Sequence, residues 1–346
     1  MKKFAIFVLA MLLPSPIWPQ TRKSTGIAEL AVYNGSDREQ VLYGGAKSEG
    51  KVVWYTSLAG DSYKAIARAF EAKYPGVRLE TYRAGGTELV PRMIEEAKAR
   101  RPIFDVLETT EDSLMISKES KLLRPYFSPY LEKYPDEVKD KVEKGLVFST
   151  NVRESYLGFG YNKSQISLGA VPKGFDGLLH PELKGKLAIT LNESSAKVIG
   201  AMSKIKGDGF VKKLKSQEIK AYTVSSAALV DMIAAGEIGA SFHIFRNHAL
   251  VSAAKGSSVG WIPMELVPTN CGGVALAAQS SHPHAALLLV DFLLNDAVKI
   301  FEKFQYGHPT VDYGFKRWYQ DRSMPLPELE KETARWEKLA KEITQR

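Results

Sequence analysis

A strand, a polar turn and an amphipathic helix follow one another between Lys51 and Phe70, in KVVWYTSLAGDSYKAIARAF. Residues 51–55 form a continuous apolar and β-branched run, and Asp61 and Ser62 supply N-cap chemistry for the helix. In an open α/β sheet, such a turn lies at the carboxyl end of a strand and beside a helix N-terminus, where N–H groups favour oxygen-rich or anionic groups. We therefore expect ligand contacts from Thr56, Ser57 and Leu58.

The composition is that of a soluble globular protein, with 45% hydrophobic and 25% charged residues. A length of 346 residues is sufficient for two domains, each with its own core. The net charge is +8, and two of these charges are the lysines of the first twenty residues. Elsewhere Lys and Arg alternate with Asp and Glu, as in LEKYPDEVKDKVEK. This pattern is typical of a solvated helix face and argues against a nucleic-acid partner.

The first twenty residues predict a signal peptide, because two lysines precede the apolar run FAIFVLAMLL. The run is short for a bilayer span, so export to the periplasm is favoured over an uncleaved anchor. Residues 21–36 are polar and small and are expected to form a flexible leader. Cys271 is the single cysteine, which excludes a disulfide framework and a lipid attached after the apolar run.

Strand and helix patterns alternate along the rest of the chain. Strands are expected at 51–55, 77–84 and 104–107, each followed by a polar turn and a helical pattern, which indicates parallel βαβ units. An aromatic strand at 154–162 and a segment rich in Pro and Gly suggest a crossing into a second domain. A second set of βα units then follows, and the loop MELVPTNCGG is expected to carry the chain back. The fold class is therefore α/β.

Six motifs resemble, in order, the extracellular solute-binding proteins of ABC importers, in the ferric-ion-binding branch of the type 2 periplasmic binding fold. They are DREQVLYGGAKSEGKVVWYTS, FDVLETTEDS, GFGYN, HPELKGKLAI, AAGEIGASF and GGVALAAQSSHPHAALLLVDFLL. The resemblance implies two α/β lobes joined by crossover strands, with a ligand cleft between them and a membrane permease as partner. The expected division is 37–160 with 265–346 for lobe 1 and 161–264 for lobe 2.

The iron-binding residues of that branch are not carried over. Its members use adjacent tyrosines shortly after a glycine-glutamate motif, here Gly236 and Glu237, but the matching stretch reads IFRNH and contains Arg246. A permanent cation in place of two phenolates reverses the preferred ligand charge. The resemblance therefore predicts a small anionic solute, with neither a metal ion nor a cofactor.

Several side chains are candidates for the anion site, and each has an ordinary structural explanation. Arg246 follows an apolar strand and could bind a carboxylate or phosphonate, or pair with a surface acid. Hydroxyl and amide groups could equally be helix caps or polar turns. These candidates are Asn192, Ser194 and Ser195 after the strand 187–191, and Ser225 and Ser226 before the glycine-glutamate motif. Thr110 and Glu111 follow the third strand, at the place of an acidic iron ligand in the family.

We expect a monomeric periplasmic component of an ABC import system that binds its solute without catalysis. An alternative keeps the fold and returns to iron, held through a bound anion or through Glu111 and His243. A periplasmic hydrolase or transferase would need a nucleophile and base arrangement, and the sequence contains no G-x-S-x-G, Walker or H-E-x-x-H motif. A sensor subunit that docks on a receptor is the remaining alternative.

Overall fold

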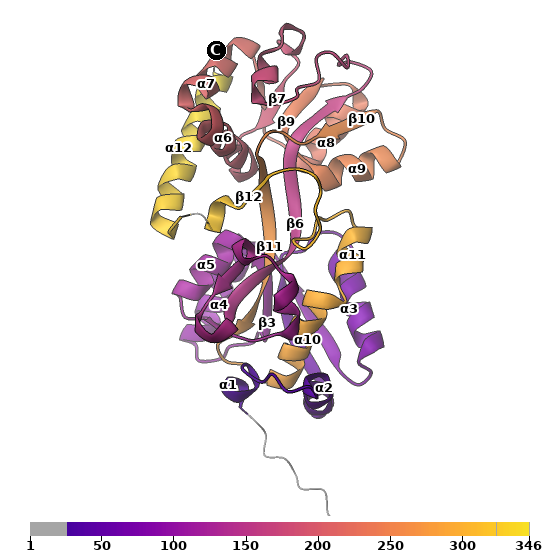
Figure 1. Ribbon diagram of the computed structural model, residues 1–346, viewed down its shortest axis with the longest axis vertical. Coiled ribbons are helices and arrows are strands. Elements are labelled where there is room, and N and C mark those ends of the chain that lie inside the picture. Colours follow the sequence, from indigo (N-terminus) through magenta and orange to yellow (C-terminus); the bar gives the residue numbers. More distant parts are fainter. Residues whose placement is uncertain (1–25, 323, 346) are drawn as a thin grey trace, which may run out of the picture.

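The computed structural model describes residues 26–322 and 324–345 and consists of two lobes joined by long strands (Figure 1). The predicted signal peptide, residues 1–20, lies outside the described residues, as do residues 21–25 of the predicted leader. Among the helices of the described residues, none is both long and apolar enough to cross a membrane.

Lobe 1, the lower lobe in Figure 1, begins with the βαβ units predicted from the sequence. Strands β2, β1 and β3 lie side by side and run parallel. The elements of this part are α1 (Ile27–Leu30), α2 (Arg38–Glu49), β1 (Lys51–Thr56), α3 (Ser62–Lys73), β2 (Arg78–Arg83), α4 (Gly86–Lys98), β3 (Val106–Thr110), α5 (Glu111–Glu119), β4 (Leu123–Arg124) and β5 (Lys139–Lys141). Residues 52–56 of β1 and 106–109 of β3 are buried, and their alternating apolar side chains belong to two separate core clusters.

Two antiparallel strands, β6 (Val147–Asn162) and β11 (Val267–Ala277), connect the lobes. The main sheet has the order β10-β6-β11-β3-β1-β2, so β6 takes part in both lobes. The predicted start of the first strand at Glu154 and the predicted loop at 264–273 were both wrong. The extra residues, VFSTNVR in β6 and VPTNCGG in β11, have no regular strand pattern, and they become extended because they pair with each other across the crossing.

Lobe 2 contains a second set of strand and helix units. Strands β9 and β10 flank the far half of β6, while β7 pairs with β8. The elements are β7 (Ala188–Thr190), α6 (Glu193–Lys206), α7 (Asp208–Lys213), β8 (Lys220–Tyr222), α8 (Ser226–Ala235), β9 (Ala240–Phe245), α9 (Arg246–Ala254) and β10 (Val259–Ile262). Short 3-10 turns occur along the whole chain, outside lobe 2 as well as within it, at Pro129–Lys133, Asp136–Val138, Glu143–Gly145, Phe175–Leu179, Pro181–Leu183, Leu214–Gln217 and Gln320–Arg322.

The C-terminal elements are divided between the lobes. Helices α10 (Pro283–Asn295) and α11 (Val298–Lys303) pack in lobe 1, and the chain then crosses a third time through β12 (Arg317–Trp318) to α12 (Leu326–Thr344). Trp336 and Leu339 of α12 are buried in a core shared with α6. This packing differs from the expected division, which assigned residues 265–346 to lobe 1. We propose lobe boundaries that place α12 in lobe 2.

The end of the predicted leader also packs on the fold. Leu30 and Ala31 are each only 2% exposed, and the Phe127 backbone N–H donates to the Ala31 carbonyl. Arg38, in the next helix, forms a buried ion pair with Asp291 of α10 at 2.8 Å. Residues 26–36 therefore differ from the flexible segment expected from their polar composition, because a few apolar residues there reach the lobe 1 core.

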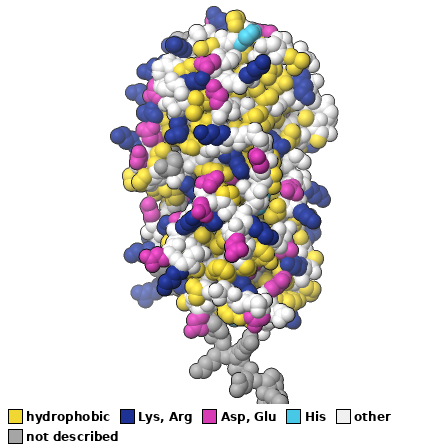
Figure 2. Space-filling view, in the orientation of Figure 1, with side chains coloured by type: hydrophobic (Ala, Val, Ile, Leu, Met, Phe, Trp, Pro, Cys, Tyr) yellow, Lys and Arg dark blue, Asp and Glu magenta, His cyan; other side chains and the backbone are white. Residues whose placement is uncertain are grey.

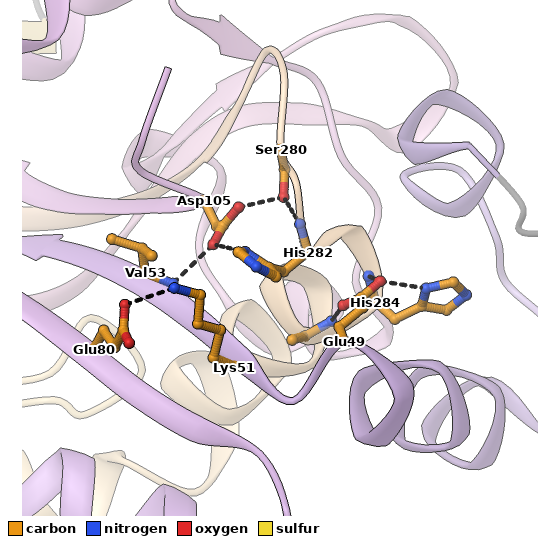
Figure 3. A network of polar contacts seen from close by, with 9 residues as sticks. Glu49, Lys51, Val53, Glu80, Asp105, Ser280, His282 and His284 are labelled. Carbon is orange, nitrogen blue, oxygen red and sulfur yellow. Dashed lines mark hydrogen bonds and ion pairs between the residues drawn. The ribbon is translucent and has the colours of Figure 1, made fainter. Parts of the chain in front are cut away.

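Two carboxylates, Asp105 directly before β3 and Glu49 of α2, form hydrogen bonds that connect the N-terminal end of α10 to β1 and α2 (Figure 3). Asp105 accepts hydrogen bonds from the Val53 backbone N–H at 2.8 Å and from the Ser280 hydroxyl at 2.6 Å, and lies 2.8 Å from His282 Nδ1. Glu49 accepts from the His284 backbone N–H at 3.0 Å. The Glu49 bond satisfies an N–H group that the first turn of a helix cannot pair internally, while the Asp105 bonds hold the segment before α10 against β1.

Glu49→Gln is expected to lower the free energy of unfolding by about 1–2 kcal/mol, because a helix N-terminus loses a charged acceptor. The Glu49 carboxylate accepts from the backbone N–H of Ala285 at 2.8 Å as well as from His284. Urea unfolding would measure the change. Glu95→Gln, at an exposed carboxylate of α4, is the matched control, and an equal effect of the two substitutions would contradict the capping role.

Candidate functional site

The turn after β1 exposes one of its three predicted contact residues. The Thr56 side chain is buried and its hydroxyl donates to Glu108 Oε2 at 2.5 Å, while the Leu58 backbone N–H donates to Thr56 Oγ1 at 3.1 Å. The Leu58 side chain is fully buried in the core. Ser57 is partly exposed and is the one of these three residues that is not buried.

Arg153 on β6 contacts Ser57 and was not among the residues predicted from the sequence. Its Nε donates to Glu108 Oε1 at 2.8 Å and its Nη2 donates to Ser57 Oγ at 3.2 Å. Burial alone would lower the pKa of the guanidinium, but the adjacent Glu108 carboxylate offsets this and raises the pKa above its ordinary value. The sequence signal that could have revealed it is a pair of adjacent charges, Arg153 and Glu154, inside an otherwise uncharged strand.

Thr110 and Glu111 begin α5, at the end of β3. Thr110 is the N-cap residue, and its Oγ1 lies 3.3 Å from Ser113 Oγ. Glu111 is buried and forms an ion pair with Arg322 at 2.9 Å. The structure therefore places the Glu111 carboxylate against a cation from the chain's own C-terminal region.

In lobe 2, the first turns of α6 and α8 meet through their serines. Asn192 caps α6, and its Oδ1 accepts from the Ser195 backbone N–H at 3.2 Å. Ser195 is buried and completes a capping box by accepting from the Asn192 N–H, so the ordinary cap explains it. Ser194 Oγ donates to Asn192 Oδ1 at 2.7 Å and lies 3.5 Å from Ser226 Oγ.

Ser225 has the role of an ordinary N-cap. Its Oγ accepts from the Ala228 backbone N–H at 3.1 Å at the start of α8. The Ser226 side chain, one residue further, is the group that lies beside Ser194 of α6. Ser194 and Ser226 are therefore the predicted serines that come together in lobe 2.

A series of buried hydrogen bonds connects Asn192 to Thr190, His243 and Ser241. His243 is fully buried; its Nε2 accepts from the Thr190 backbone N–H at 3.3 Å, so its Nδ1–H donates to Ser241 Oγ at 2.8 Å. Thr190 Oγ1 lies 2.8 Å from His243 Nε2 and accepts from Asn192 Nδ2 at 3.0 Å. Burial lowers the pKa of His243 to about 3, so the ring is neutral and both of its nitrogens are used.

Arg246 is the first residue of α9, and its guanidinium carbon lies 5.2 Å from the ring centroid of Tyr313. No Asp or Glu within the described ranges forms an ion pair with Arg246. The next residue, Asn247, is 8% exposed, and its Oδ1 has no hydrogen-bond partner among the groups that the structure describes. A partly exposed cation at a helix N-terminus is suited to bind an oxyanion.

The described residues contain no group of three or more His, Cys, Asp or Glu side chains that could hold a metal ion. The two side chains considered for iron are engaged elsewhere, the Glu111 carboxylate with Arg322 and the neutral His243 ring with Thr190 and Ser241. On the face drawn in Figure 2, Lys and Arg side chains are interspersed with Asp and Glu side chains. This mixed surface agrees with the absence of a single-sign charge stripe in the sequence.

Comparison with solved structures shows a common fold. An iron- and citrate-bound protein of Trichodesmium (IdiA, FutA) has a TM-score of 0.66 at 19% identity, covering 86% of this chain and 100% of the other. Iron-bound HitA of Pseudomonas aeruginosa has a TM-score of 0.64 at 19% identity over 85% and 99%. The periplasmic binding protein AfuA of Actinobacillus pleuropneumoniae, with fructose-6-phosphate bound, has a TM-score of 0.58 at 22% identity over 85% and 96%. The predicted two-lobed α/β fold is thereby confirmed.

A search of curated proteins finds no match. The family model of the bacterial extracellular solute-binding proteins matches residues 65–300, which is more than half of the chain. This match includes β6, which joins the lobes, and the first turns of α5, α6, α8 and α9, where the predicted site residues other than Thr56, Ser57 and Leu58 lie. The chain belongs to the bacterial extracellular solute-binding proteins.

Proposed function

We propose that this solute-binding component of an ABC importer binds a small anionic solute between its lobes. In this proposal Arg246 neutralises the solute, while Ser57 from lobe 1 and Ser194 and Ser226 from lobe 2 bind its oxygens. The observation that carries the proposal is the Arg246 guanidinium, which lies at the start of α9 with no carboxylate partner among the described residues. A helix N-terminus adds partial positive charge at the same place.

The transport step is binding without catalysis. A solute that bridges the lobes has a higher affinity for the closed state than for the open state and so shifts the equilibrium toward closure. The closed monomer then docks on the permease from the periplasmic side. Fructose-6-phosphate in AfuA, and citrate in the Trichodesmium protein that also contains iron, are anions bound by proteins of this fold, which supports an anion as the transported solute.

Iron is the second candidate, because two of the similar structures contain it. The residues proposed for it in this chain are Glu111 and His243, and both are already engaged. Glu111 pairs with Arg322, and each ring nitrogen of His243 has a hydroxyl within 2.8 Å. Iron uptake would therefore depend on a bound anion as the principal ligand.

Native mass spectrometry of the purified, undenatured protein, with metal analysis of the same sample, separates these candidates. We expect a retained small acid without stoichiometric iron. Stoichiometric iron without such an acid would reject the anion proposal and return the protein to metal transport.

Arg246→Ala is expected to weaken the affinity for the retained acid about 10- to 100-fold, which is the effect of losing a charge-assisted hydrogen bond. Titration calorimetry with the acid identified by mass spectrometry measures the change. Lys255→Ala is the matched control, because it removes the same charge from an exposed position at the other end of α9. Equal affinities of the two variants would contradict the role of Arg246.

A further inference from the structure

The Arg153 side chain is held on four sides. Glu108 binds its Nε at 2.8 Å and Ser57 binds its Nη2 at 3.2 Å. The ring of Tyr306, from the segment that follows α11, has its centroid 5.5 Å from the guanidinium carbon. On the fourth side is Gly272 of β11, where a Cβ atom would lie 2.4 Å from both Arg153 Cζ and Glu108 Oε1. This close fit fixes the guanidinium in one orientation.

The hydrogen bond from Arg153 determines how Ser57 can act. A guanidinium has five N–H donors and no acceptor, so Ser57 Oγ must accept from it. The backbone N–H of Ser57 is also used, since it donates to the Glu108 carbonyl oxygen at 2.9 Å. The Ser57 O–H cannot donate to Arg153 and is free to donate to a group outside the turn. Because Ser57 is partly exposed, that group can belong to a solute.

We propose that Arg153 is a positioning residue of the solute site and commits the Ser57 hydroxyl to act as a hydrogen-bond donor. Lobe 1 then selects an acceptor oxygen, such as that of a carboxylate, phosphate or phosphonate, and rejects an ammonium group. This inference rests on the proposed function and deepens it by defining the solute chemistry that the turn after β1 accepts.

A buried ion pair for stability alone is the simpler explanation of the same geometry. Such a pair requires the contact between Arg153 and Glu108, but it does not require the second guanidinium nitrogen to reach a partly exposed hydroxyl. The test therefore has to report on the contact between Arg153 and Ser57 and must not depend on stability.

Ser57→Cys provides this readout, because a thiol near a guanidinium donor ionises more easily. We expect the introduced thiol to have a pKa of about 7.5 or lower, against about 8.5 for an ordinary thiol. The pH dependence of its alkylation by iodoacetamide measures this value.

Wild-type protein gives the background, since the natural thiol, Cys271, is only 3% exposed. Ala59→Cys, at an exposed position of the same turn, is the matched control. Equal thiol pKa values in the two variants would overturn the inference.

Arg153→Lys in the Ser57→Cys background identifies the cause of the shift. Lysine keeps a positive charge for Glu108 but has no second nitrogen to reach residue 57, so we expect the thiol pKa to return most of the way to its ordinary value. A shift that persists in this double variant would also overturn the inference. The proposed function is judged separately, by the retained acid and its response to Arg246→Ala. If Arg153→Lys does not fold, the comparison of Ser57→Cys with Ala59→Cys still decides.

Discussion

Replacing Arg153 with methionine is expected to lower the free energy of unfolding by about 3–5 kcal/mol, among the largest effects of a single substitution in this chain. The substitution leaves the Glu108 carboxylate, which is fully buried, without its counter-ion. The Thr56 hydroxyl and the Ser57 N–H still donate to that carboxylate, but neither carries a charge. Urea unfolding followed by circular dichroism measures the loss as a lower midpoint at an unchanged slope.

The double variant Arg153→Met with Glu108→Gln is expected to recover a large part of this loss. No unpaired charge then remains in the interior, and a glutamine oxygen can still accept from Thr56. Lys98→Met serves as the surface control, because its ion pair with Glu95 is exposed to solvent and contributes little. If the double variant is no more stable than Arg153→Met, lost packing rather than the unpaired charge causes the destabilisation.

The local units of the fold could be predicted from the sequence because their signals are local. The apolar run at 51–55 and the pair Asp61 and Ser62 predicted β1 and α3, and the structure confirms both elements. The predicted capping bond is absent, because the Asp61 side chain accepts no backbone N–H of the first turn and the Ser62 hydroxyl donates to the Ala59 carbonyl at 2.7 Å. The extent of β11 could not be predicted in this way. Its first residues, which include Pro268, become a strand only because β6 and β12 supply partners from distant parts of the chain.

The candidate site was only partly predictable, for the same physical reason. A residue type and its place after a strand point to Ser57, Ser194, Ser226 and Arg246, but they do not show which side chains a cap or an ion pair already occupies. Arg153 shows the limit most clearly. Its partners Glu108 and Ser57 are 45 and 96 residues away in the sequence, and only the packing of β6 against lobe 1 brings the three together.

Two buried histidines are expected to make the protein unstable in mild acid. Burial lowers the pKa of His243 to about 3 and that of His308 to about 4. In the unfolded chain both titrate near 6.5, so between pH 6.5 and 4 the unfolded state binds protons that the folded state does not. Stability is therefore fully present above pH 6.5 and falls as the pH is lowered, by about 1.4 kcal/mol per pH unit for each histidine.

His308→Gln separates this effect from the titration of carboxylates. The imidazole of His308 accepts from the Thr310 backbone N–H through Nδ1, and its Nε2 lies 3.1 Å from the Tyr134 hydroxyl, so the substitution costs some stability at pH 7. Its diagnostic effect is on the slope: between pH 6.5 and 4 the free energy of unfolding should fall less steeply than in wild type, by about 1.4 kcal/mol per pH unit.

His180→Gln is the control, because the His180 imidazole is exposed to solvent in the folded chain as well as in the unfolded chain. An unchanged slope in His308→Gln would mean that His308 is protonated as readily in the folded chain as in the unfolded one, and acid sensitivity would then arise from the carboxylates. For a protein that binds its solute outside the cytoplasm, the stability at pH 7 and its decrease per pH unit together determine the pH at which the folded, binding-competent form is lost.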